Sequence, residues 1–185
     1  MTEMIMAHAR HPNSASPDLI ERVQRDSSRY FALHGDRANG LILDSTQNES
    51  PVSIAVVGFG LTVFPIAVRR GWMSRSEAVA RVLAALHFFH DADQSGAHRS
   101  VGYKGFFFHF LHAKTGERVW ESELSTIDTA LLVAGMLFAA RYFDGDADDE
   151  CELRRLATAI YERIDWRWAQ DGGHALAFGW MPETK

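Results

Sequence analysis

Two kinds of helical segment alternate along the sequence, and this alternation constrains the fold more than any other feature. The segments at about 17–34, 74–90 and 149–168 carry apolar residues on one side only. The segments at about 52–70 and 125–143 are apolar on nearly every side. An amphipathic helix suits an outer layer, whereas a helix that is apolar all round must be buried. We therefore expect an all-α fold with about five helices in alternating outer and inner layers.

The connections between these segments alternate as well. Residues 71–73 and 144–148 form short turns, whereas 35–51 and 91–124 are long loops. In an up-and-down array, connections of one parity lie at one end, which we call the long-loop rim. Long loops inside a compact domain are usually functional. The pattern predicts a two-layer helical toroid whose working face is this rim.

The length of the chain is short for a closed toroid. A toroid of this kind has about six helical hairpins and needs well over about three hundred residues at ordinary helix and loop lengths. The 185 residues supply two and a half hairpins. We therefore expect a fragment, or a chain that completes its core with a second chain or by self-association.

Composition excludes several classes of protein. The net charge is −5 and no Lys/Arg stripe is present, which argues against a nucleic-acid partner. The longest apolar run, 54–68, is interrupted by glycine and proline and falls short of a membrane span. With one cysteine, Cys151, the chain has no disulfide framework.

The first residues differ from the rest. Residues 1–16 are expected to be a flexible N-terminus, with Ser16 as the cap of the first helix and Pro17 at its first position, and 17–185 to be one domain portion. The N-terminus lacks the continuous apolar core of a signal peptide. The chain as written is therefore expected in the cytoplasm, and would be exported if its true N-terminus lies upstream.

Five segments in order resemble the glycoamylase-like family, a group of (α/α)6-toroid carbohydrate-active domains. They are Ser53–Thr62 with Arg70-Gly-Trp72, Gly105–Leu111, Glu123–Leu132, Asp165–Trp168 and Gly179–Glu183. The resemblance implies an incomplete (α/α)6 toroid and hydrolysis of β-linked glucans. Endo-β-1,2-glucanases belong to this family, and related domains occur in cyclic β-1,2-glucan synthases. The family's domain is more than twice this length, and the half that follows Glu183 is absent here.

Carboxylates gather where the inner segment 125–143 begins. Glycoside hydrolysis needs a carboxylic acid to protonate the leaving oxygen and a carboxylate to activate water or attack directly. Asp128 and Glu123 are the catalytic candidates, and the resemblance favours Asp128; Glu121 is a candidate for substrate binding. The alternative is a structural role, since Ser125-x-x-Asp128 has the pattern of a helix capping box. The partner carboxylate is expected in the missing half.

The long loop 91–124 carries a short hairpin rich in aromatic residues. Tyr103 and His109 are candidates for binding sugar hydroxyls and faces, whereas the neighbouring phenylalanines are expected to pack on the inner helices. At the end of the fifth segment, Trp166 and Arg167 are further substrate-binding candidates, with Arg167 paired to an acid of the rim. One of the two tryptophans there, 166 or 168, is expected to anchor the core.

No metal or cofactor site is predicted. The acidic stretch 144–150 lacks the glycine and glutamate of a calcium loop and is expected to be a solvated helix start. The histidine pairs 87/90 and 109/112 lack a zinc pattern. Gly58 and Gly60 favour a close approach of helices over room for substrate.

Three functional hypotheses follow. The leading one is a truncated glycoside-hydrolase-like domain that acts on an oligo- or polysaccharide by carboxylate acid/base catalysis. The alternative is a non-catalytic remnant, a glucan-binding or interaction module that needs a partner chain. A cyclase or transferase for apolar substrates is disfavoured, because no aspartate-rich metal motif lies on the long-loop rim.

Overall fold

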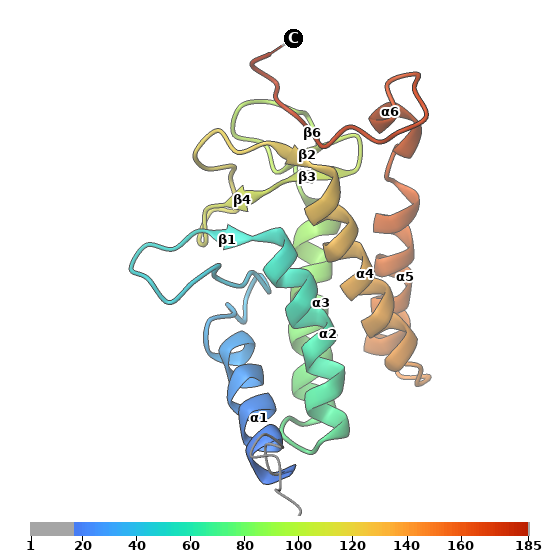
Figure 1. Ribbon diagram of the computed structural model, residues 1–185. Coiled ribbons are helices and arrows are strands. Elements are labelled where there is room, and N and C mark those ends of the chain that lie inside the picture. The colour runs from blue at the N-terminus through green and yellow to red at the C-terminus, as the bar shows by residue number, and fades with distance from the viewer. Residues whose placement is uncertain (1–16, 185) are drawn as a thin grey trace, which may run out of the picture.

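A computed structural model of the protein describes residues 17–184 (Figure 1). The predicted flexible N-terminus and the predicted cap at Ser16 lie outside these residues. Five long helices occur where the sequence predicts them, and a short sixth helix follows. They are α1 (Pro17–Leu33), α2 (Ile54–Arg69), α3 (Arg75–Asp91), α4 (Thr126–Tyr142), α5 (Asp148–Glu162) and α6 (Trp166–Ala169).

The fifth helix is not continuous, which corrects the predicted segment 149–168. It ends at Glu162 and restarts at Trp166. The backbone N–H of Asp165 donates to the carbonyl of Lys104 (2.9 Å), and its side chain caps α6 by accepting from the N–H of Trp168 (2.9 Å). A contact from a distant loop therefore fixes the break, and helical periodicity alone does not reveal it.

The long helices form two layers. The contacts pair α2 with α4 and α3 with α5, and α1 packs against α2. Between α2 and α4 the backbones approach closely at Gly58 and Gly135, where a Cβ on either residue would overlap the other helix. The predicted reason for Gly58 is thus confirmed. At Gly60 the close neighbour is a side chain and not a helix backbone, since a Cβ there would overlap the side chain of Ile42 in the loop after α1.

The inner helices are not buried on every side. On α4 the exposed large side chains are Ile127, Leu131, Leu137 and Phe138, and on α2 they are Phe59 and Ile66. The outer helices α3 and α5 cover only one side of this pair. We call these six residues the uncovered inner face. Their exposure corrects the prediction that the two helices are enclosed.

Small sheets occupy the long loops. Strands β2 (Gly102–Tyr103), β3 (Phe106–Phe108), β5 (Leu124–Ser125) and β6 (Gly179–Trp180) form an antiparallel sheet in the order β2-β3-β5-β6, and β1 (Val52–Ser53) pairs with β4 (Phe110–Leu111). The β2–β3 hairpin is the predicted one. The other strands are only two residues long, too short to show an alternating pattern.

The predicted rim is observed. Figure 1 shows the strands and α6 together at one end of the helices, with the short turns after α2 and α4 at the other end. Phe106, Phe107 and Phe108 are fully buried. β3 contacts the inner helix α4, and the ring of Phe107 packs edge-on against Phe89 of the outer helix α3 (4.9 Å). The hairpin thus packs on both helix layers, not on the inner layer alone as predicted. Among the described residues, no helix combines the length and apolar character needed to cross a membrane.

The acidic start of α5 is solvated only in part. Asp148 and Asp149 are exposed in the first turn, as predicted. Glu150 is instead buried and accepts two hydrogen bonds from the Arg75 guanidinium (2.6 and 2.7 Å), which lowers the pKa of the Glu150 carboxyl. This ion pair joins the start of α5 to the start of α3.

Candidate active site on the long-loop rim

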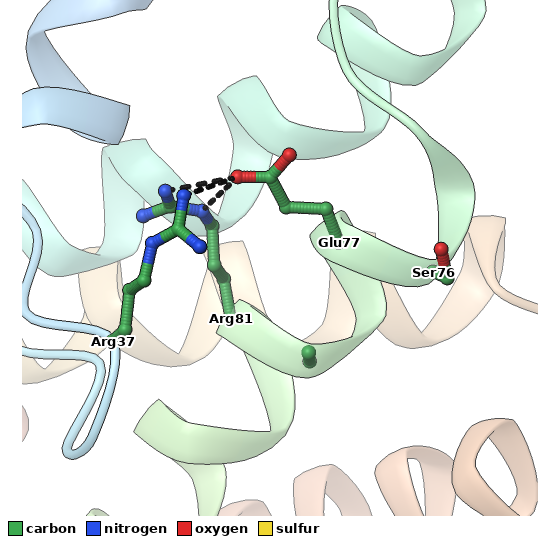
Figure 2. A pocket seen from close by; sticks show the side chains of 5 residues that line it. Arg37, Ser76, Glu77 and Arg81 are labelled. Carbon is green, nitrogen blue, oxygen red and sulfur yellow. Dashed lines mark hydrogen bonds and ion pairs between the residues drawn. The ribbon is translucent and has the colours of Figure 1, made fainter.

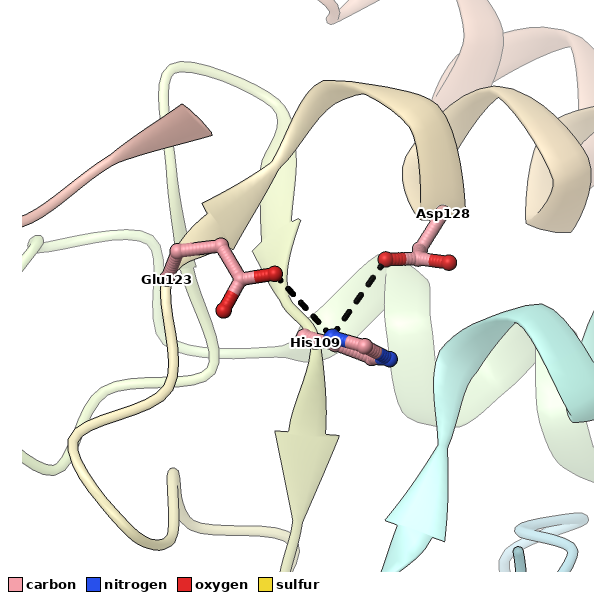
Figure 3. A group of neighbouring side chains, drawn as sticks. All are labelled: His109, Glu123 and Asp128. Atoms are coloured by element: carbon pink, nitrogen blue, oxygen red, sulfur yellow. Dashed lines mark hydrogen bonds and ion pairs between the residues drawn. The ribbon is translucent and has the colours of Figure 1, made fainter. Parts of the chain in front are cut away.

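His109, Glu123 and Asp128 meet on the rim (Figure 3). The His109 Nδ1 atom lies 3.0 Å from Glu123 Oε1 and 3.6 Å from Asp128 Oδ2. These three side chains are partly buried, with exposed fractions of 27% for His109, 30% for Glu123 and 16% for Asp128. We call them the rim triad. The structure thus brings together both predicted catalytic residues and one predicted binding residue.

Strand pairing sets the first contact of the triad. His109 follows β3 and Glu123 precedes β5, and these strands pair Phe108 with Leu124. The N–H of His109 extends the ladder by donating to the carbonyl of Glu123 (2.9 Å). Since cross-strand neighbours on one face lie close together, the two side chains meet.

The capping residue of α4 sets the second contact. Ser125 accepts a hydrogen bond on its Oγ from the N–H of Asp128 (3.1 Å). In a full capping box the acid would reach back to the backbone N–H of the cap. Here the Asp128 carboxylate faces His109 instead. Ser125 therefore caps the helix, and the Asp128 carboxylate is left for the rim triad.

The imidazole of His109 is fixed in orientation. Its ring stacks on Phe110, with centroids 3.8 Å apart and planes 14° apart. Its Nδ1 faces two carboxylates, which accept hydrogen bonds when ionised, so Nδ1 carries the proton. The Nε2 atom is then the one available to a ligand. This arrangement supplies two carboxylates and one imidazole to a bound molecule.

The rim triad could also hold a divalent cation. Its three ligand atoms all lie within 4.8 Å of one another, and imidazole with carboxylates suits several divalent metals. No sequence motif predicts such a site, because His109 and Glu123 lie next to strands β3 and β5 and Asp128 lies in helix α4. The carboxylate oxygens of Glu123 and Asp128 thus lie within 4.8 Å of each other, closer than the roughly 6.5–9.5 Å between the two carboxyl groups of inverting glycosidases.

The remaining predicted residues lie elsewhere on the rim. Glu121 is exposed and makes no contact with the triad. Tyr103 stacks on Trp180 (centroids 5.1 Å). Trp166 packs edge-on against the buried Phe106 (5.1 Å), and Trp168 contacts the same ring (5.8 Å), so both tryptophans pack on the core where one was predicted to. Arg167 is exposed and forms no ion pair with any residue from 17 to 184, so its predicted acidic partner is not found there.

An aromatic pocket beside the sheet was not predicted. Trp168 and Trp180 line it together with residues of the segment 169–184, and its volume is about 370 Å³. Tyr103 contacts both tryptophans, at 5.5 Å and 5.1 Å between ring centroids. The only sequence signal for this pocket was Trp180 within the segment Gly179–Glu183. Its position in the sequence did not indicate a role in binding.

An ion pair between a buried arginine and a half-exposed glutamate fastens the C-terminal segment to the rim. The Arg118 side chain is 1% exposed and donates to both carboxylate oxygens of Glu183 (2.6 and 3.2 Å). It also lies over the ring of Phe108 (4.3 Å) and donates to the carbonyl of Ser122 (2.6 Å). The Arg118 guanidinium lowers the pKa of the Glu183 carboxyl to about 2.

A further pocket lies between α3 and the loop after α1 (Figure 2). Arg37 and Arg81 both donate to the same oxygen of Glu77, at 3.1 and 3.0 Å. The side chain of Arg81 is 6% exposed, whereas that of Arg37 is 76% exposed. The Glu77 carboxylate thus joins the loop to the helix. This structural role accounts for the charged residues that line the pocket.

Comparisons with known proteins agree with this fold. No protein-family model matches the sequence. The chain is 24% identical over 173 residues to an exo-β-1,2-glucooligosaccharide sophorohydrolase (non-reducing end) of Parabacteroides distasonis; the match covers 89% of this chain and 23% of that protein. The chain therefore spans about a quarter of the length of this relative.

Solved structures show the same relationship. The chain superposes on an endo-β-1,2-glucanase of Chitinophaga pinensis, in complex with sophorotriose and glucose, with a TM-score of 0.79 and 19% identity over 94% of this chain and 42% of the other. A proposed glucoamylase of Bacteroides uniformis gives a TM-score of 0.82 and 22% identity over 92% and 42%. The fold is thus part of a glycoamylase-like toroid, and the chain resembles this family over part of the relatives' length.

Proposed function

We propose that the protein is a truncated glycoside-hydrolase-like domain that acts on β-linked glucan, with β-1,2-glucan as the first substrate to test. The observation that carries the proposal is the rim triad, in which two partly buried carboxylates meet an imidazole at the predicted working rim. The relatives supply the substrate class, since one is described as acting on β-1,2-glucooligosaccharides.

Asp128 is the carboxyl group that we assign to proton transfer. Glu123 accepts the shorter contact from His109 (3.0 Å), whereas Asp128 lies at 3.6 Å and is freer to exchange a proton with a substrate. Glu123 is then oriented by His109 and is the second candidate of the pair. A carboxylate from a chain that covers the uncovered inner face is the other source of the second group.

Reducing-sugar release from linear β-1,2-glucan tests this assignment. We expect Asp128→Asn to lower the rate by at least about a hundredfold, the usual effect of losing a general acid or base. Asp146→Asn is the matched control, because Asp146 is exposed at the opposite end of the helices. Wild-type rates with Asp128→Asn would disprove the role of Asp128.

The same assay separates proton transfer from metal chemistry. Carboxylate catalysis needs no cation, so a chelator should leave the wild-type rate unchanged. Loss of activity with chelator, and its return with an added divalent cation, would assign the rim triad to a metal instead.

The second candidate function is a glucan-binding or interaction module that acts with a second chain or a second copy. The uncovered inner face supports it, because six large apolar side chains there are exposed. An exposed apolar surface of this kind marks an interaction site. A wild-type protein that binds glucan but releases no reducing sugar would favour this candidate.

A further inference from the structure

Trp120 and Phe178 are the most exposed large apolar side chains among the described residues. The exposed fraction of Trp120 is 71%, although the neighbouring Phe110 and Val119 are partly buried. A large aromatic ring left in water loses the favourable burial that such rings normally provide.

The backbone holds Trp120 in this position at a cost. Trp120 and Glu121 both have positive φ, 59° and 51°, and the N–H of Ser122 closes the turn on the carbonyl of Val119 (3.1 Å). Positive φ at both central residues is the pattern of turns that favour asparagine and glycine. Residues other than glycine with positive φ are strained, and such residues cluster at binding and active sites.

A groove lies beside the Trp120 ring. Its volume is about 600 Å³, and its lining brings together a turn before β1 and the loop after β4. The lining residues are Glu49, Ser50, Pro51, His112, Ala113, Lys114, Val119 and Trp120. Glu49 is exposed and also has positive φ, 60°. Glu49, His112 and Lys114 offer both acceptors and donors to hydroxyl groups.

Stacked rings connect this groove to the rim triad. Trp120 packs edge-on against Phe110, with centroids 5.3 Å apart, and Phe110 stacks on His109. The groove therefore begins about two side chains from the carboxylates.

We infer that Trp120 and the groove beside it form a second sugar-binding subsite, which takes a glucose unit of a β-linked glucan outside the rim triad. This inference rests on the proposed glucan substrate but needs no catalysis. The ring face would stack on one sugar ring, and the polar lining would bond its hydroxyls, as in sites that combine apolar surface with a few polar groups.

Isothermal titration calorimetry on the full chain tests the subsite. The probes are the disaccharide sophorose and linear β-1,2-glucooligosaccharides of about five to seven glucose units. We expect Trp120→Ala to weaken binding of the longer probes by about tenfold and to leave binding of the disaccharide unchanged. Trp120→Phe should recover most of the affinity. Phe178→Ala is the matched control, because Phe178 has the same exposed fraction, 71%, outside the groove.

The possible outcomes separate this inference from the proposed function. Length-dependent loss of binding with Trp120→Ala supports the subsite even if the protein releases no reducing sugar. Equal binding of the long probes by wild type and Trp120→Ala overturns it, and so does equal loss of disaccharide and long probes. Failure of the wild type to bind any of the probes also overturns it.

Discussion

At the scale of single residues, Ser125 and Asp128 show how one motif serves two purposes. The sequence Ser-x-x-Asp predicts a capping box, and half of it is present, since Ser125 caps α4. The Asp128 carboxylate faces His109 instead of the backbone. Local sequence can identify the pair but cannot decide which way the carboxylate turns, because His109 comes from another segment.

This division of roles predicts different effects on stability. Ser125→Ala should lower the free energy of unfolding by about 1 kcal/mol, because it removes a helix cap. Asp128→Asn should leave it within about 0.5 kcal/mol, the range typical of positions without a stabilising role. Urea unfolding of both variants measures the difference. A larger loss with Asp128→Asn than with Ser125→Ala would show that Asp128 is mainly structural.

At the scale of elements, the contact between α2 and α4 depends on glycine. Gly135→Ala should lower the free energy of unfolding by about 1–3 kcal/mol, because the added methyl overlaps Gly58 and forces the helices apart. Helix propensity alone would predict the opposite, a gain of about 1 kcal/mol. Thermal or urea unfolding distinguishes the two, with the exposed Ala134→Ser on the same helix as control.

The C-terminal strand β6 is held by an ion pair that responds to pH. The pKa of Glu183 is about 2 in the folded protein, against an ordinary value of 4.5, so its ion pair stabilises the fold above about pH 4.5. That contribution should be lost as the pH falls from about 4.5 toward 2.

The variant Glu183→Gln tests this dependence. The difference in urea midpoint between wild type and Glu183→Gln should be constant above about pH 5 and should shrink at pH 3. Glu121→Gln, at an exposed carboxylate, should show no such change. A difference that stays the same down to pH 3 would mean that the Arg118–Glu183 pair does not stabilise the fold.

At the scale of the whole molecule, the main feature is the uncovered inner face. The chain matches 42% of two solved relatives, and its inner helices are covered on one side only. We expect the wild-type protein, of 20.8 kDa, to associate at micromolar concentrations, because large apolar surfaces favour contact.

Substitution on this face provides the measurement. Phe138→Glu on α4 should shift light-scattering mass toward that of a single chain. Tyr161→Glu on α5 is the matched control, since Phe138 and Tyr161 are both 46% exposed and only Phe138 belongs to the uncovered inner face. A wild-type protein that remains a single chain at high concentration would contradict the expectation.

The sequence by itself determined the long helices, their two layers and the rim on which the long loops gather. Helical periodicity, caps such as Ser125 and glycines such as Gly58 are local signals, and the structure contains each of them. Only the tertiary structure decided which rim residues meet. The His109–Glu123 contact depends on strand register, the Arg118–Glu183 pair joins distant segments, and the exposure of Trp120 depends on a strained turn. Two-residue strands and long-range ion pairs have no periodicity, so no pattern in the sequence predicts them.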